Sequence, residues 1–386
     1  MGKILFISNI SNRISSFVTA SIAAAHNLNL DFYQTANWQN VPREQIFANE
    51  QAYDIKIKSV PISRNPFSPA NLAAYKALVA LIKREKIDCI HCNTPVGGML
   101  GRLAGKKCGV KKVIYQAHGF HFYKGAPLKN WLLYYPVERW LARYTDALIT
   151  INQEDYALAK RKMKLRNGGR VYYVPGVGVD PQKFGGAATD RAAKRRELGI
   201  PEDAVLLLSV GELNDNKNHE TVIRAIADMN VYYIIAGRGK LREHLENVID
   251  AQNLRGRVKL LGFRSDVKEL YEAADIFVFP SFREGLSISM MEAMASGLPC
   301  VASRIRGNSD LLENREGGFL CDPSNASEFA EKLKLLAADA ALREKMGSVN
   351  RMSVQKFSTE NVIRQMQRIY AAQLLGDESI CLKENR

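Results

Sequence analysis

Short apolar segments alternate with amphipathic ones along most of this 386-residue chain. Such alternation is typical of parallel sheets that are covered by helices on both faces. It breaks once, at Pro175-Gly-Val-Gly-Val-Asp180, where glycine and proline favour a hinge between domains. We therefore expect an α/β protein built from two doubly wound domains with parallel sheets.

The expected elements form two series, one on each side of this hinge. In the first series the expected strands are 3–8, 31–35, 55–61, 88–93, 112–117, 147–151 and 170–174, and the helices are 14–25, 69–86, 96–108, 127–143 and 153–164. In the second series the strands are 204–210, 231–236, 258–261, 276–279, 300–302 and 318–321, and the helices are 219–227, 240–252, 267–273, 287–295, 326–337 and 342–346. A last amphipathic helix is expected at 359–375, whereas residues 183–196 are polar and predict no regular element.

The positive charge of the chain is concentrated in its first half. The net charge is +14, and residues 1–175 contain 25 Lys and Arg against 10 Asp and Glu, whereas the remainder contains 29 and 30. This asymmetry favours an anionic partner, and we expect a peripheral protein at the inner face of the cytoplasmic membrane. No aromatic RNA-binding motif supports nucleic acid, and no apolar window is long enough to span a bilayer. A solvated basic face without a partner is the alternative.

The cysteines do not suggest a metal or redox centre. Cys89 and Cys92 have CxxC spacing, but they lie in an expected strand, where residues three apart point to opposite faces. We therefore interpret them, with Cys108, Cys300, Cys321 and Cys381, as thiols of a protein in a reducing cytosol.

The stretch from Ile276 to Pro299 carries the strongest functional signal. An apolar strand runs into a polar loop with Glu284, and a helix then starts near Ser287 and carries Glu292. A helix N-terminus suits a phosphate, and here it lies between two acids. A nucleotide sugar, with a diphosphate between two hydroxyl-rich groups, has the matching shape.

Other expected strands of the second series also end in loops suited to phosphates. Gly211 and Lys217 follow one strand, Gly237-Arg-Gly239 follows the next, and Phe263-Arg264 follows a third. Ligands of doubly wound sheets bind beyond these carboxyl ends. The first strand of the chain, by contrast, ends in a loop without glycine, which disfavours a dinucleotide there.

The two glutamates, with seven residues between them, and the Gly211 to Lys217 turn resemble the retaining glycosyltransferases of family 4. Val174 to Asp180 resembles the interdomain linker of that family. His91-Cys-Asn-Thr-Pro95 and Gln116-Ala-His-Gly-Phe-His121 are similar to its capsular and exopolysaccharide subgroup. The resemblance implies the GT-B fold, in which two Rossmann-like domains face a central cleft. Residues 1–176 would bind the acceptor, residues 177–355 would bind the donor, and a helix at about 356–375 would return to the first domain.

The resemblance also implies roles for particular residues. Glu284 would contact the donor sugar, Lys217 the diphosphate, Glu292 the ribose, and His118 the sugar near the reacting carbon; Glu284, His118 and Lys217 form the expected catalytic set. The remaining donor contacts would be Gly211, Arg238, Phe263, Arg264, Gly285, Leu286 and Ser287. The acceptor contacts would be Asn9, Ser11, Thr94 and His118.

The implied reaction is retaining transfer of a hexose or N-acetylhexosamine from a UDP-sugar to a saccharide acceptor, linked to polyprenyl diphosphate. Neither a metal nor a cofactor is expected. Two departures from the family stand out: Glu212 replaces a phosphate-binding arginine, and Asn9 to Arg13 replaces a Gly-Gly loop.

Several alternatives remain open at this stage. A nucleotide-sugar epimerase shares the fold, and a non-enzymatic protein that binds anionic surfaces would explain the basic half. Glu284 could cap a helix, Glu292 could be an exposed helix acid, and His118 could be structural. Residues 128–143, with mixed aromatic and basic side chains, fit either an interfacial helix or an ordinary core helix.

Overall fold

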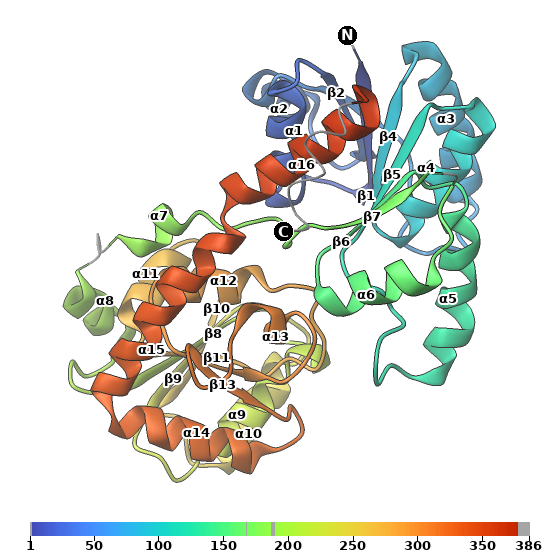
Figure 1. The fold of residues 1–386 in the computed structure, drawn as a ribbon. Coiled ribbons are helices and arrows are strands. Elements are labelled where there is room, and N and C mark those ends of the chain that lie inside the picture. The colour runs from blue at the N-terminus through green and yellow to red at the C-terminus, as the bar shows by residue number, and fades with distance from the viewer. Residues whose placement is uncertain (1, 167, 187–189, 377–386) are drawn as a thin grey trace. The chain divides into compact units, whose positions relative to one another are not determined.

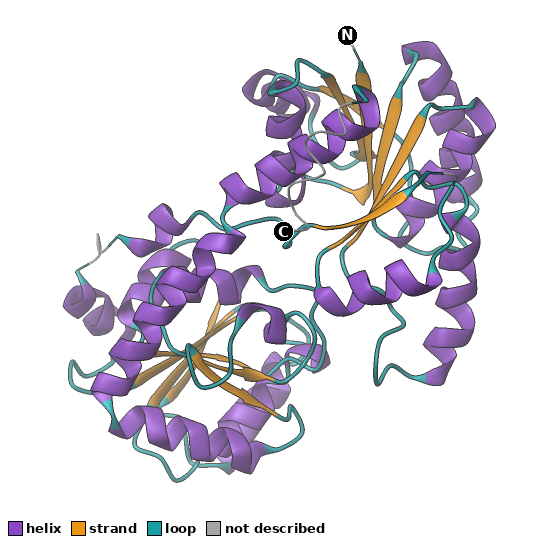
Figure 2. Ribbon diagram, in the orientation of Figure 1, coloured by secondary structure: helices purple, strands orange, loops and turns teal. Residues whose placement is uncertain are grey.

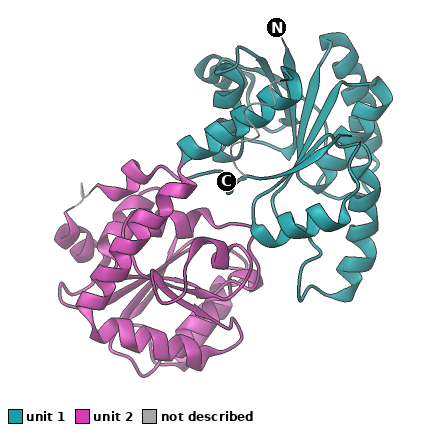
Figure 3. Cartoon of the chain, viewed as in Figure 1, with its two compact units in different colours: residues 1–178, 359–386 teal, residues 179–358 magenta. Residues whose placement is uncertain are grey.

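The computed structural model describes residues 2–166, 168–186 and 190–376. The chain divides into two compact units (Figure 3). Unit 1 contains the chain up to Gly178 and the segment from Thr359 onward, and unit 2 is Val179–Ser358. In each unit, helices cover both faces of one parallel sheet (Figure 2).

Unit 1 contains a seven-stranded sheet in the order β3-β2-β1-β4-β5-β6-β7 (Figure 1). Its strands are β1 Lys3–Ile10, β2 Asp31–Asn37, β3 Lys56–Ser59, β4 Cys89–Asn93, β5 Lys112–Ala117, β6 Ala147–Thr150 and β7 Arg170–Tyr173. Its helices are α1 Ser16–His26, α2 Arg43–Tyr53, α3 Ala70–Glu85, α4 Pro95–Cys108, α5 Leu128–Ala142, α6 Gln153–Lys162 and α16 Thr359–Leu374. The strand order reverses between β1 and β4.

The two faces of this sheet bury separate apolar cores. Cys92 belongs to one core and Cys89 to the other, so the prediction that these thiols point to opposite faces is confirmed. Helix α4 lies close to the sheet because it is rich in glycine: a Cβ at Gly98 would stand 2.4 Å from the Tyr115 ring. Helix α16 packs beside α1, where the Tyr370 hydroxyl lies 2.7 Å from His91 Nδ1.

Unit 2 contains a six-stranded sheet in the order β10-β9-β8-β11-β12-β13. Its strands are β8 Leu206–Val210, β9 Tyr232–Ala236, β10 Val258–Gly262, β11 Ile276–Phe279, β12 Cys300–Ser303 and β13 Gly318–Cys321. Its α-helices are α7 Pro181–Gly185, α8 Arg191–Leu198, α9 His219–Ala225, α10 Arg242–Ala251, α11 Val267–Ala273, α12 Ile288–Ala295, α13 Asn308–Leu311, α14 Ala326–Ala338 and α15 Ala340–Ser353. Here the strand order reverses between β8 and β11.

The prediction that residues 183–196 form no regular element is wrong, because α8 occupies the end of this stretch. Its polar sequence hides a buried cation. Arg195 is 2% exposed, and its Nη2 donates to Asp275 at 2.6 Å while its other nitrogens donate to backbone carbonyls. Asp190 caps the helix by accepting from the Ala193 N–H at 2.9 Å. Polar pairing therefore replaces the apolar periodicity on which the prediction relied.

Helix α5 is not an ordinary core helix. Within it, only Leu141 and Ala142 are fully buried against the described part of the chain. Its exposed apolar side chains include Leu128, Leu132 and Leu133, which are 72%, 70% and 54% exposed. No helix among residues 2–166, 168–186 and 190–376 has the length and apolarity that crossing a membrane requires.

Candidate functional site

The carboxyl ends of β8 and β11 lie where the strand order of unit 2 reverses, which is the usual ligand position in such sheets. The loop after β8 contains a short 3-10 helix, Asp215–Lys217, and the loop after β11 carries Glu284. Lys217 Nζ donates to Glu284 Oε1 at 2.8 Å, and both side chains are mostly buried, at 18% and 16% exposed. The structure thus brings together two residues that lie 67 positions apart in the sequence.

The Lys217 ammonium is held in place from several sides. It lies 4.5 Å from the centroid of the Phe279 ring, a favourable cation–π contact. The Lys217 N–H donates to Asn214 Oδ1 at 3.0 Å, which fixes the start of its turn. Gly211 leaves room for the lysine stem, since a Cβ there would stand 3.1 Å from Lys217 Cε. A positive charge is therefore positioned at the strand ends before any ligand arrives.

Backbone contacts fix the loop that carries Glu284. Asn216 Nδ2 donates to the Arg283 carbonyl at 2.9 Å, and the Phe282 N–H donates to the Asn216 carbonyl at 2.8 Å. On the other side, Gly307 has φ +78°, and a Cβ there would stand 2.4 Å from the Gly285 carbonyl oxygen. A larger residue at position 307 would displace the loop.

Asn216 and Asn218 lie in the loop just before α9. The side chain of Asn218 makes no capping bond to α9, and its Nδ2 instead donates to the carbonyls of Pro280 and Pro323 at 3.0 and 2.8 Å. Together with Asn216, it therefore ties the loop after β8 to the loop after β11. Sequence reasoning missed this use of the asparagines and the role of Gly307.

Helix α12 starts beside Glu284. Ser287 is its cap, with Oγ accepting from the Met290 N–H at 3.3 Å, so the capping alternative for Glu284 is wrong. Glu292, one turn into the helix, is half-buried, and its Oε2 accepts from the Tyr271 hydroxyl at 3.0 Å. Burial raises the pKa of the Glu292 carboxyl. Glu292 is thus not an ordinary exposed helix acid.

The two candidate arginines differ in their surroundings. The Arg264 guanidinium donates at 2.7 Å to both Asp266 and Glu197, and these carboxylates raise its pKa. Arg238 is exposed, pairs with no carboxylate in the described part of the chain, and lies 5.5 Å from the Phe263 ring. Arg238 is therefore the cation that remains available of the two.

Glycine allows the loops after β8 and β9 to touch backbone to backbone. A Cβ at Gly237 would stand 1.7 Å from the Gly211 oxygen, and one at Gly239 would stand 2.2 Å from the Leu213 oxygen. Glu212, which stands where the family has arginine, is exposed, and its Oε2 accepts from Asn214 Nδ2 at 2.9 Å. Its carboxylate is thus used within its own loop.

Unit 1 has a cavity of about 360 Å3 at the carboxyl ends of β1, β4 and β5. Ser11, Thr94 and His118 line it, as do Phe17, Gln34, Arg64 and Asn93. Buried Gln34 Oε1 and Asn93 Nδ2 find no hydrogen-bond partner among the described residues. Buried polar groups are normally paired, so these atoms favour a polar ligand in the cavity.

His118 is a neutral hydrogen-bond acceptor in this cavity. Its Nε2 lies 2.9 Å from Asn93 Oδ1, and because that oxygen accepts, Nε2 carries the proton. Nδ1 then holds a lone pair, and it has no partner among the described residues. Burial lowers the pKa of His118 to about 4, and the Phe17 ring packs edge-on against it at 5.1 Å.

Asn9 and Thr94 contact each other. Thr94 Oγ1 donates to Asn9 Oδ1 at 2.7 Å, and the Gly97 N–H donates to the same oxygen at 2.7 Å. Thr94 has φ +64°, a strained value for a β-branched residue, which this bonding holds at the start of α4. Thr94 lines the cavity, whereas Asn9 supports it from behind. The Ser11 hydroxyl donates to the Arg13 carbonyl at 2.8 Å.

Two parallel-sheet Rossmann-like domains define the GT-B class of glycosyltransferases. The structure of Anabaena Alr3699/HepE in complex with UDP matches this fold with a TM-score of 0.77 at 20% identity, over 96% of this chain and 100% of that one. The glycosyltransferase WaaG of lipopolysaccharide biosynthesis matches with a TM-score of 0.71 at 18% identity, over 95% and 99% of the two chains.

Sequence comparison identifies the family. The model of glycosyl transferases group 1 matches residues 190–352, and that of glycosyl transferase 4-like proteins matches residues 3–152. A putative glycosyltransferase of Bacillus subtilis, EpsD, is 40% identical over 81% of this chain and 84% of its own. The UDP-Gal:alpha-D-GlcNAc-diphosphoundecaprenol alpha-1,3-galactosyltransferase of Escherichia coli is 30% identical over 76% of each chain. The chain therefore belongs to the group 1, 4-like glycosyltransferases.

Proposed function

We propose that this glycosyltransferase moves a hexosyl or N-acetylhexosaminyl group from a UDP-sugar to a saccharide linked to polyprenyl diphosphate, with retention at the anomeric carbon. The observation that carries the proposal is the Lys217–Glu284 pair of 2.8 Å beside the start of α12, where the sheet order of unit 2 reverses. A cation, a carboxylate and a helix N-terminus meet there, as a nucleotide sugar requires.

The relatives support the choice of substrates. The solved HepE complex contains UDP, and the Escherichia coli enzyme is named for a UDP-sugar donor and a diphosphoundecaprenol acceptor. EpsD, whose sequence is more similar, is a putative glycosyltransferase and supports sugar transfer as the reaction. The motifs at 91–95 and 116–121 support capsular or exopolysaccharide synthesis as the setting. Of the functions that the sequence left open, an epimerase and a non-enzymatic binder find no such support.

Donor binding follows from the residues of unit 2. Lys217, aided by Arg238, meets the diphosphate together with the amides of Gly285, Leu286 and Ser287 at the start of α12. Glu284 accepts from hydroxyls of the donor sugar, and Glu292 accepts from the ribose while Tyr271 holds its other side. Phe263, 66% exposed, offers a ring face to the uracil, whereas Arg264 stays paired with Asp266 and Glu197.

In the proposed reaction the bond between the anomeric carbon and the β-phosphate oxygen breaks as a bond to an acceptor oxygen forms on the same face. The proton of the acceptor hydroxyl passes to the departing phosphate. Negative charge therefore grows on the diphosphate, where Lys217 is already positioned. A preorganised donor of this kind is worth roughly 3 kcal/mol in the transition state. The protein residues supply the charge stabilisation, so the proposal includes no metal.

Acceptor binding is assigned to the cavity of unit 1. His118 Nδ1 and Gln34 Oε1 accept hydrogen bonds and Asn93 Nδ2 donates one, so sugar hydroxyls can satisfy all three. Ser11 and Thr94 complete the polar wall, and Asn9 positions Thr94. The basic charge of this half and the exposed apolar side chains of α5 suit a peripheral position at the inner membrane face.

Two measurements test the proposal. The full chain is screened with UDP, GDP and ADP sugars, and only UDP-sugars should raise the unfolding temperature. A ligand at a hundred times its dissociation constant stabilises by about 2.7 kcal/mol. NMR of the transfer product should show the anomeric configuration of the donor. Protection by another nucleotide sugar would contradict the choice of a UDP-sugar donor. A product with inverted anomeric configuration would contradict retention.

A further inference from the structure

A hydrogen-bonded loop carries Arg64 from the end of β3 to the acceptor cavity. Asn71, 6% exposed, organises this loop: its Oδ1 accepts from the Ser63 N–H at 3.0 Å, and its Nδ2 donates to the Asn65 carbonyl at 2.8 Å. Arg64 lines the cavity and pairs with no carboxylate in the part of the chain that the structure describes. The cavity thus has a free cation at its rim and unsatisfied polar atoms at its floor.

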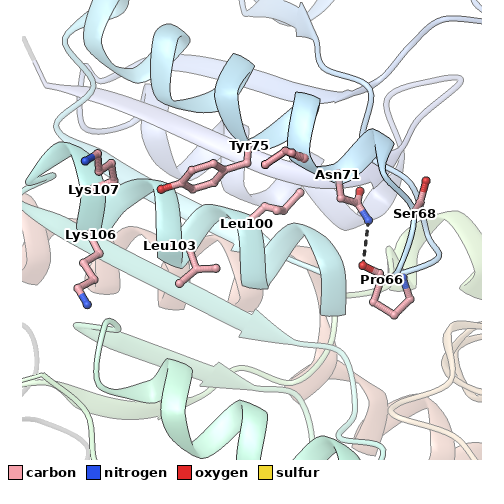
Figure 4. Close-up of a pocket in the computed structure, with 9 residues that line it drawn as sticks. Pro66, Ser68, Asn71, Tyr75, Leu100, Leu103, Lys106 and Lys107 are labelled. Atoms are coloured by element: carbon pink, nitrogen blue, oxygen red, sulfur yellow. Dashed lines mark hydrogen bonds between the residues drawn. The ribbon is translucent and has the colours of Figure 1, made fainter.

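The same loop borders a second hollow on its other side. A groove of about 690 Å3 runs between α3 and α4, with Pro66 and Ser68 at one end and Lys106 and Lys107 at the other (Figure 4). Between these ends, the walls are formed by Tyr75, Leu100 and Leu103, together with Leu72. Few polar atoms interrupt this wall, so the groove suits an apolar chain.

Exposed apolar side chains lie in this loop and at the start of the helix that follows it. Phe67 follows Pro66 in the loop and is 85% exposed, and Leu72 at the start of α3 is 62% exposed. Apolar groups gathered on a surface usually mark a binding site. Arg64 lines the cavity and Pro66 lines the groove, so residues only two positions apart in the loop border the two hollows.

We propose that Arg64 binds the diphosphate of the lipid-linked acceptor and that the groove between α3 and α4 holds the first isoprene units of its chain. This inference rests on the proposed function and adds to it the part of the acceptor that unit 1 recognises. The sugar lies on the polar floor beside His118 and Asn93. The phosphate meets Arg64 at the rim, and the chain crosses the loop onto Leu72 and Leu103.

The position of Arg64 explains why the acceptor chain would need an apolar groove. For the diphosphate to reach Arg64, the first isoprene units must leave the bilayer. In water each exposed methylene would weaken binding about fourfold. An apolar groove that starts at the phosphate site covers these units, while Lys107 at its far end faces anionic headgroups.

The test uses one saccharide diphosphate esterified with water-soluble alkyl chains from methyl to decyl, so that no detergent is needed. For the wild-type chain, KM should fall at least tenfold from methyl to decyl. Leu72→Glu should keep the wild-type rate with the methyl ester and lose the dependence on chain length. Leu132→Glu is the matched control, because Leu132 is 70% exposed but lies on α5, outside the groove, and should keep the dependence.

Arg64 is tested with the same acceptors and with the free saccharide. Arg64→Ala should raise KM for every diphosphate ester about tenfold and leave the free saccharide unaffected, and Arg64→Lys should restore part of the loss. A wild-type KM that does not change with chain length would contradict the proposal that the groove binds the isoprene units. A chain effect that appears only with vesicles and disappears in Leu132→Glu would instead assign the lipid contact to α5. Failure of transfer with every acceptor, methyl ester included, would refute the proposed function itself.

Discussion

The ammonium of Lys217 donates a 2.8 Å hydrogen bond to the Glu284 carboxylate between the two strands where the order of the second sheet reverses. The pair balances two charges that are more than four-fifths buried. It also keeps the lysine close to α12, where a diphosphate would exchange the carboxylate for phosphate oxygens. In the proposed mechanism this pair is the ligand-free state, and donor binding requires only a small movement of the Lys217 side chain.

Arg238 and Arg264 should respond differently to removal. Arg238→Ala is expected to weaken UDP binding about tenfold, or ~1.4 kcal/mol, without changing Tm, because its guanidinium is exposed and free of carboxylates. Arg264→Ala should leave the Kd for UDP unchanged but cost about 1 kcal/mol of stability, because it loses Asp266 and Glu197. Calorimetric titration measures the Kd for UDP of both variants, and thermal unfolding measures their stability. The reverse pattern would exchange the two roles.

The ionised carboxylate of Glu292 should lower the free energy of unfolding, because burial disfavours its charge. Because burial raises its pKa, the folded state binds its proton more tightly than the unfolded state does. Stability therefore falls as pH rises from the unfolded pKa of the Glu292 carboxyl through its higher folded pKa, and the cost persists at higher pH. Glu292→Gln should raise Tm at pH 7, with the gain vanishing on acidification below the unfolded pKa.

The same variant should weaken UDP binding by one to two orders of magnitude, as expected for losing a charged acceptor of hydroxyl hydrogen bonds. Glu313→Gln, at an exposed acid in the same unit, is the control and should change neither quantity. If Glu292→Gln binds UDP with the wild-type Kd, then Glu292 does not contact the ribose.

Three histidines, of which His91 and His219 are buried and His118 is half-buried, should make the protein sensitive to mild acid. Burial lowers the pKa of His91 to about 3 and those of His118 and His219 to about 4. Between pH 6.5 and 4 the unfolded chain takes up protons that the folded chain refuses, so stability falls as pH falls. Each histidine contributes up to ~1.4 kcal/mol per pH unit in this window.

Urea unfolding measured across that range tests the effect. His118→Gln should make the dependence shallower by about one proton, and the activity of the wild-type chain should show no step from His118 between pH 6 and 8. An NMR titration of His118 with a midpoint near 6.5 would contradict its burial as a neutral acceptor.

Arg195 should be essential to the fold of unit 2. Arg195→Ala removes the buried cation from Asp275, which keeps only the half-exposed Arg191 at 2.6 Å, and leaves several carbonyls without a donor. Loss of one partner of a buried pair costs about 3–5 kcal/mol. The neighbouring Arg196 is 63% exposed and pairs with the exposed Glu202, so Arg196→Ala should change stability by less than about 1 kcal/mol. Chemical denaturation of both variants distinguishes a buried pair from an ordinary surface pair.

The strands could be predicted from the sequence because each is a compact apolar run that its sheet buries, and all thirteen expected strands are present. Helix α8 could not, because its buried side is made by Arg195 and Lys194, which read as surface residues until their carboxylates are known. Helix α2 was not predicted either, because none of its residues is fully buried and it therefore has no apolar stripe.

The sequence motifs propose a role for single residues, but they do not predict the contacts between distant loops. Glu284 and Lys217 were each identified separately, but their ion pair depends on loops tied together by Asn216 and Asn218. Gly307 gave no local signal, because its requirement is set by the Gly285 carbonyl. Arg64 lay in an unremarkable loop until folding brought it to the cavity of unit 1.

A transfer assay tests the central claim most directly. The purified full chain is incubated with UDP-hexoses and UDP-N-acetylhexosamines and with a diphospholipid-linked N-acetylglucosamine, and single-turnover rates are compared among variants. The wild-type chain and Lys240→Ala, which breaks only the exposed pair with Asp215, should form lipid-linked disaccharide at similar rates. Lys217→Ala and Glu284→Gln should form it roughly 100-fold to 1,000-fold more slowly. Unchanged rates in both variants, or conversion of the free sugar nucleotide without a lipid-linked product, would contradict the account.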